Sequence, residues 1–165
     1  MFKKILLFVS LITTLFASNE TSYPSTWKDF EKVRTPLSIM GVIPECSKDV
    51  SSLPPIYQET VATYCGVKPG GPGAVEILIN AKAKESFATR NGTHPDDAVM
   101  ILHLIELKLL FVTTYKNNKP FYSIYTEDGH DASASTGSGL NPNDCRSCHT
   151  GYGAFCVNGQ CASLE

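Results

Sequence analysis

The chain has 165 residues, of which 42% are hydrophobic and 18% are charged, and its formal net charge is −2. This length suits one domain, and the hydrophobic content can build a core, which excludes an intrinsically disordered chain. The mildly acidic balance provides no basic patch, and therefore argues against a nucleic-acid partner and against binding to anionic lipid.

Residues 1–17 have the pattern of a signal peptide. Lys3 and Lys4 form a basic start, an apolar run follows, and Ala17 is a plausible cleavage edge. The apolar run is short for a bilayer span, so we expect no stable membrane insertion after cleavage. The sequence thus predicts export to the periplasm, a polar tether over residues 18–25 and a single domain over residues 26–165.

Two short helices separated by a loop are predicted next. Residues 25–33 place aromatic side chains at helical spacing, and Trp27 is expected in the core. Residues 37–55 are rich in small polar residues and prolines, which indicates a loop. The second helix is predicted over residues 55–65, starting at a proline and capped by Gly66.

Strand patterns follow. The glycines and prolines of residues 68–73 predict a tight turn, and residues 74–79 predict a strand. The run over residues 98–115 is ambiguous, because its leucines suit a helix. However, Glu106 and Lys108 are two positions apart, and such residues share a face on a strand but not on a helix. We therefore predict one long strand there.

A turn over residues 116–120 and an alternating segment over residues 121–126 complete a predicted hairpin. Residues 127–143 are rich in Gly, Ser, Asp and Asn, which predicts a long loop. No internal repeat and no second domain can be recognised in the sequence. Helices followed by hairpin-paired strands indicate an α+β fold built on an antiparallel sheet.

The loop leads to Cys145-Arg146-Ser147-Cys148-His149, a C-x-x-C-H motif typical of c-type haem attachment. Two thiols add to the two vinyl groups of a haem, and the histidine becomes an axial ligand of the iron. A structural zinc site would need a second ligand pair at matching spacing. A redox dithiol opens a helix after a strand, whereas this motif follows a loop. We therefore predict one covalent haem c, held by Cys145 and Cys148, with His149 as the iron ligand.

Removing the two motif cysteines leaves Cys46, Cys65, Cys156 and Cys161. An oxidising compartment outside the cytoplasm permits disulfides between them. Three pairings are possible, with free thiols as the alternative. The pairs Cys46–Cys65 and Cys156–Cys161 are favoured because both close short loops.

The chain offers few ligands for the second axial position of the iron. No methionine follows His149, so a sixth ligand must come from upstream, where the suitable residues are Met40, Met100, His94, His103 and His130. Each has an ordinary structural role as its alternative. Without such a ligand the haem is five-coordinate, and pocket polarity and access decide between gas binding, activation and electron transfer. The aromatic residues that could wall such a pocket are Phe87, Phe111, Phe121, Tyr122 and Tyr125.

Several sequence features follow one another along the chain. They are the segment from Trp27 to Phe30, Ile56-Tyr57-Gln58 before Gly73-Ala74-Val75, the hairpin with Phe121-Tyr122, and the C-x-x-C-H near the C-terminus. In this order and spacing the chain, from Trp27 to His149, resembles the cytochrome P-460 family and its cytochrome c′-beta branch. The resemblance implies an antiparallel sheet with packed helices, a single haem, His149 as proximal ligand and a pocket for small nitrogen-oxide ligands. It also allows a homodimer. A four-helix cytochrome c′ is the main competing fold, and the hairpin and the prolines of residues 36–72 count against it.

One departure from the family separates its branches. The hydroxylamine-oxidising members carry a lysine that is cross-linked to the porphyrin, and the matching position here is Leu78, with Lys82 and Lys84 further along. The closer resemblance is therefore to the cytochrome c′-beta branch, whose apolar pockets bind nitric oxide or carbon monoxide. An oxidoreductase acting on hydroxylamine or nitric oxide stays as one alternative, with Glu76 or Glu106 as a base. A low-spin electron-transfer cytochrome is the other. A redox partner protein is expected in each case.

Overall fold

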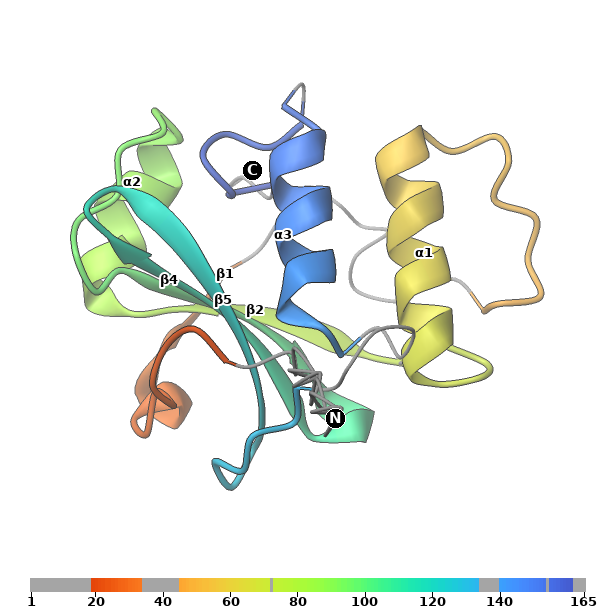
Figure 1. The fold of residues 1–165 in the computed structure, drawn as a ribbon, viewed down its shortest axis with the longest axis horizontal. Helices are drawn as coiled ribbons and strands as arrows, with labels where there is room; N and C mark the ends of the chain where they lie inside the picture. Colours follow the sequence, from red (N-terminus) through yellow and green to blue (C-terminus); the bar gives the residue numbers. More distant parts are fainter. Residues whose placement is uncertain (1–18, 34–44, 72, 134–139, 154, 162–165) are drawn as a thin grey trace, which may run out of the picture.

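The computed structural model describes residues 19–33, 45–71, 73–133, 140–153 and 155–161. These residues form a five-stranded antiparallel sheet with helices packed on one side, so the predicted α+β architecture is confirmed (Figure 1). The strands follow one another in chain order: β1 (Glu31–Val33), β2 (Val75–Ile79), β3 (Val99–Leu104), β4 (Leu109–Lys116) and β5 (Lys119–Thr126). The helices are α1 (Pro55–Val67), α2 (Lys84–Thr89) and α3 (Pro142–Gly151).

The sheet is buried on both sides, and alternate residues of each strand face opposite ways. On the helix-facing side, Val61 and Tyr64 of α1 pack against Val75, Leu104 and Leu109. Further along the same side, a second cluster gathers around α2, made of Ile79, Ala83, Phe87, Ala98, Met100 and Tyr115. The two clusters leave the middle of this side to α3.

The opposite side of the sheet is covered by the N-terminal segment. Trp27, only 6% exposed, packs with Leu78, Ile101 and Leu110, so its predicted place in the core is confirmed. The segment over residues 25–33, predicted as a helix, forms only a 3-10 turn over Trp27–Asp29 and then strand β1. Pairing of β1 with β2 satisfies the backbone of these residues, and this long-range contact overrides the local helical pattern.

Residues 19–21 lie along the free edge of β5. The side-chain amide of Asn19 accepts from the backbone N–H of Ile124 at 2.6 Å and donates to its carbonyl at 2.8 Å. The carboxylate of Glu20 accepts from the N–H of Tyr122 at 2.6 Å. These residues fall within the segment that the sequence suggests as a tether. In the structure they form hydrogen bonds with backbone groups of β5 that would otherwise bind a neighbouring strand.

The predicted helix at residues 55–65 is confirmed as α1 and extends two residues further. It begins at Pro55, whose missing N–H costs nothing in a first turn. The helix continues to Val67, and Lys68 rather than Gly66 is its C-terminal cap. The predicted strand at residues 74–79 is confirmed as β2.

The run over residues 98–115 forms two strands, so the prediction of one long strand is wrong. A 3-10 turn over Ile105–Leu107 separates β3 from β4, and Lys108 then takes φ +53°. This turn lets the chain reverse without glycine or proline. Ile105 is 39% exposed at this reversal. The predicted strand at residues 121–126 is confirmed within β5.

Two disulfides join the four cysteines outside the C-x-x-C-H motif. Cys46 is bonded to Cys65, and Cys156 is bonded to Cys161, so the favoured pairing is confirmed. The predicted signal peptide and Met40 lie outside the described residues. Within the described ranges, no helix combines the length and hydrophobicity needed to cross a bilayer.

Candidate functional site

Helix α3 carries all three predicted site residues and is the central helix in the view of Figure 1. Its start is encoded locally, because the Asn141 side chain accepts from the N–H of Asn143 at 3.0 Å and Pro142 occupies the first helical position. Cys145 and His149 are four residues apart and therefore lie on one face of the helix. Cys148, three residues after Cys145, lies beside them. The motif thus presents two thiols and an imidazole toward the same region.

That region is a mainly apolar cavity between α3, α1 and the helix-facing side of the sheet. Its floor consists of strand residues: Ile77, Met100, Leu102, Phe111, Thr113 and Tyr122. Its walls include Ile56 and Tyr64 of α1, and Cys145, Cys148 and His149 of α3. The space between these walls is about 1200 Å³, counting the open mouth. This mainly apolar space lies directly beside the two thiols and the imidazole of the motif.

His149 is held in one tautomer. Its Nδ1 lies 2.6 Å from the carbonyl oxygen of Gly159, and only a protonated Nδ1 can donate to that acceptor. Burial lowers the pKa of His149, so the imidazole is neutral, although the bond to Gly159 acts in the opposite direction. Nε2 therefore carries the free lone pair that a metal ligand needs.

The neighbours of His149 restrict its orientation. The ring of Tyr122 meets the imidazole edge to face, with centroids 5.3 Å apart. The guanidinium of Arg146 lies over the same tyrosine ring at 5.3 Å and pairs with Glu20. The Tyr122 hydroxyl is buried without a hydrogen-bond partner, and Tyr122 lines the cavity.

The two motif thiols are unsuited to redox exchange. Cys145 and Cys148 form no disulfide. Burial, together with the negative charge of Asp144, raises the pKa of the Cys145 thiol to about 12. Burial, together with the negative charge of Glu59, raises the pKa of the Cys148 thiol to about 11. Catalytic dithiols instead have lowered pKa values, because the thiolate is the reactive form. The described residues also contain no cluster of three or more His, Cys, Asp or Glu side chains of the kind that holds zinc.

Of the residues considered as sixth iron ligands, Met100 lines the cavity. His103 lies on the other side of the sheet, where its two ring nitrogens each contact a carboxylate at 2.8 Å, Glu76 and Glu127. His94 is stacked on Tyr115 in the core beside α2. His130 is exposed beside Asp128. None of these three histidines is among the residues that line the cavity.

The aromatic residues expected to wall the pocket divide between several places. Phe87, Phe111 and Tyr122 line the cavity. Tyr125 instead packs with Trp27 on the opposite side of the sheet. Phe121 borders a separate hollow, which Arg146, His149 and Thr150 of α3 also line.

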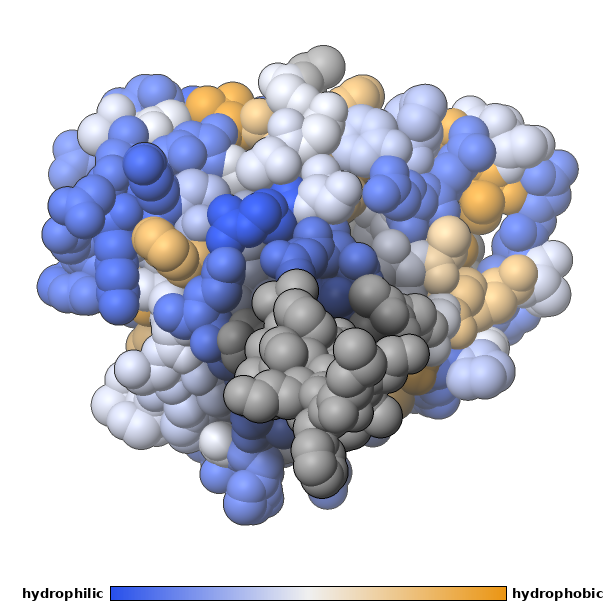
Figure 2. Space-filling view, in the orientation of Figure 1, coloured by the Kyte–Doolittle hydropathy of each residue, from blue (hydrophilic) through white to orange (hydrophobic). Residues whose placement is uncertain are grey.

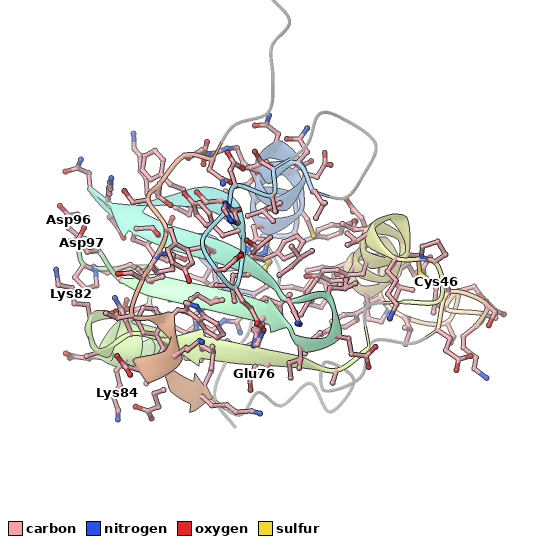
Figure 3. All side chains as sticks on the ribbon, turned by 90° about the horizontal axis from the view of Figure 1, so that it is seen from below. Cys46, Glu76, Lys82, Lys84, Asp96 and Asp97 are labelled. Carbon is pink, nitrogen blue, oxygen red and sulfur yellow. A yellow bond between two sulfur atoms is a disulfide. The ribbon has the colours of Figure 1, made fainter. Side chains whose placement is uncertain are left out.

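The residues expected of a hydroxylamine-oxidising site lie elsewhere. Leu78 packs against Trp27, on the side of the sheet away from the cavity. Lys82 pairs with Asp97 and Lys84 with Glu31, at the end of the sheet far from Cys46 and α1 (Figure 3). The two carboxylates considered as bases are also engaged: Glu76 contacts Lys32 and His103, and Glu106 contacts Lys68.

Sequence reasoning missed the contribution of residues 156–161 to the site. Gly159 and Gln160 line the cavity, and Gly159 supplies the acceptor for His149. A signal was present, because Asn158-Gly159 is the dipeptide most typical of a two-residue hairpin turn and it lies between two cysteines.

Comparison of the chain with protein-family models, with curated proteins and with solved structures finds no match.

Proposed function

We propose that this chain is an exported c-type haem protein whose single haem is attached through Cys145 and Cys148, with His149 as axial ligand. The observation that carries the proposal is the neutral His149, which donates from Nδ1 to Gly159, keeps the lone pair of Nε2 and lines an apolar cavity beside two unpaired thiols. A haem supplies an iron that can take a diatomic ligand or an electron. The disulfides fit the oxidising compartment in which thioether-linked haem is made.

We further propose that the bound haem presents an open coordination position to small neutral ligands such as nitric oxide or carbon monoxide. The lining supports this choice, because it is mostly apolar and Asp144 is the one carboxylate among its described residues. A mainly apolar pocket with few charges favours an uncharged diatomic over an ionic substrate. The described lining also contains no lysine and no glutamate, which gives no support to hydroxylamine oxidation.

A second function, electron transfer, has one specific observation in its favour. Met100 lines the cavity, and a methionine thioether is a known axial ligand of electron-carrying haems. Met100 also packs in the cluster around α2 and is only 7% exposed, which accounts for it as a core residue. The two roles predict different spectra.

The test uses protein exported together with a haem-attachment system. We expect haem staining that survives denaturation in the wild type and is lost in a C145S/C148S variant. A C46S/C65S variant loses the same number of cysteines and should keep the stain. The reduced wild type should give a high-spin spectrum that changes on addition of carbon monoxide or nitric oxide. Absence of covalent haem would contradict the proposal, and a low-spin spectrum indifferent to gas would favour Met100 as a sixth ligand.

A further inference from the structure

Residues 156–161, a short distance after the end of α3, form a small closed unit that contacts His149. Val157 and Gln160 exchange two backbone hydrogen bonds, at 2.9 and 3.0 Å, around Asn158 and Gly159. Both central residues have positive φ, +45° and +84°, as a type I′ turn requires. The disulfide between Cys156 and Cys161 closes the two ends. We call residues 156–161 the C-terminal hairpin; in Figure 1 this dark-blue segment folds back beside α3, on the side of α2.

The C-terminal hairpin is fixed to several parts of the core. The Asn158 side chain donates to the carbonyls of Gly92 and Asn118, at 3.0 and 2.9 Å. The buried hydroxyl of Tyr115 donates to the Asn158 carbonyl at 2.9 Å. The Gln160 side chain donates to the carbonyl of Phe87 at 2.9 Å. These hydrogen bonds hold the C-terminal hairpin in a fixed position against the sheet and α2.

Close contacts around position 159 favour glycine over any residue with a side chain. A Cβ atom at Gly159 would lie 2.9 Å from the hydroxyl oxygen of Tyr122 and 3.1 Å from Pro120. Glycine therefore allows the hairpin to pack directly on β5. The carbonyl of Gly159 then lies 2.6 Å from Nδ1 of His149.

We propose that the C-terminal hairpin, locked by the Cys156–Cys161 disulfide, is a positioning element that sets the strength of the bond between His149 and the haem iron. This inference rests on the proposed haem function. A hydrogen bond from the Nδ1–H to a carbonyl fixes the ring and raises the basicity of Nε2, and such outer contacts commonly change metal affinity or activity about 10–100-fold. The disulfide thereby acts on the haem site through one backbone carbonyl.

The chain provides a matched control in its other disulfide, Cys46–Cys65, which joins α1 to the preceding loop. The experiment compares C156S/C161S with C46S/C65S, each loaded with haem, by resonance Raman spectroscopy of the reduced protein. We expect the iron–histidine stretching band to shift to lower frequency in C156S/C161S and to stay at the wild-type frequency in C46S/C65S. A Y115F variant removes one anchor of the hairpin and keeps both disulfides. It should shift the band in the same direction by a smaller amount.

The outcomes separate the two proposals. A wild type that carries no covalent haem overturns the proposed function, and the inference with it. A haem-loaded wild type whose iron–histidine band is unchanged in both C156S/C161S and Y115F overturns the inference alone. Equal shifts in C156S/C161S and C46S/C65S also overturn it, because the effect would then follow from general loss of stability.

Discussion

The guanidinium of Arg146, which lies between the two motif cysteines, contacts both carboxylate oxygens of Glu20, 126 residues earlier in the chain. The same carboxylate accepts the backbone N–H of Tyr122, the residue whose ring lies beside His149. Glu20 thus ties together the N-terminal segment, the edge strand β5 and the helix that carries the motif. In the view of Figure 2 the visible surface outside the grey atoms is mostly hydrophilic, with separate hydrophobic areas toward the top and the right.

Replacing Glu20 should measurably weaken this connection. Exposed ion pairs contribute about 0–1 kcal/mol, and a hydrogen bond to a charged group contributes about 1.5–3 kcal/mol. We expect E20A to lower the free energy of unfolding by about 1–3 kcal/mol in urea titrations. E20Q keeps an acceptor for the Tyr122 N–H and should lose less. Equal losses in the two variants would show that the hydrogen bond contributes nothing.

The carboxylate of Glu76 should make stability depend on pH. Burial alone would raise its pKa, but hydrogen bonds from Lys32 and His103 outweigh burial and hold the pKa of Glu76 below its ordinary value. A lowered folded-state pKa adds stability that is fully present above the unfolded value of about 4.3 and is lost as the pH falls through the folded-state pKa.

E76Q is the variant that isolates this contribution. At pH 7 it should be less stable than the wild type by about 1–2 kcal/mol, because it loses the charged hydrogen bonds. As the pH falls below about 4.3 the difference should shrink, since the wild-type carboxyl becomes protonated. Urea unfolding at a series of pH values measures the gap. A gap of constant size over the whole range would be inconsistent with the lowered pKa.

Substitution of Gly159 should disturb both the fold and the site. Its φ of +84° is unfavourable for other residues, and the Cβ of alanine would press against Tyr122 and Pro120. We expect G159A to lower the free energy of unfolding by about 1–3 kcal/mol, the usual cost of one strained backbone position. G153A is the control, because a Cβ at Gly153 meets nothing within 4 Å. Thermal or urea unfolding of the two variants gives the comparison, and equal stability would contradict it.

Met100 separates a core role from an iron-binding role. As a nearly buried residue that lines the cavity, it should cost about 2–5 kcal/mol of stability when replaced by alanine and less than about 1.5 kcal/mol when replaced by leucine. The optical spectrum of reduced, haem-loaded M100L should match that of the wild type. A change from low-spin to high-spin in M100L would instead identify Met100 as a sixth ligand.

Local features of the chain could be predicted from the sequence, and long-range ones could not. The start of α1 at Pro55, strand β2 and the pairing of the four cysteines follow from turn residues, alternation and loop length. Helix α3 was not predicted, although its helical spacing alone brings the three residues of the C-x-x-C-H motif together. The reversal at Lys108 was missed because it uses φ +53° at a lysine, without the glycine or asparagine that marks such turns.

The surroundings of the motif depend on contacts between distant segments. Nothing near His149 in the sequence indicates that Tyr122 lies beside its ring, or that Glu20 pairs with Arg146. Helix α2 was also missed, because its six residues are too few for a recognisable hydrophobic period. The sequence thus predicts which atoms would bind a haem, and only the fold shows what holds them.

The side-chain amide of Asn19, which pairs with both backbone groups of Ile124, has a consequence for how copies of this chain meet. An uncovered strand edge is a template on which another chain can add a strand, and this is a common route to aggregation. Proteolytic loss of residues 19–21 would bare the backbone of β5 at Tyr122 and Ile124. Residues 19–21 thus end the sheet at β5 within one molecule, because they occupy backbone groups on which a further strand could pair.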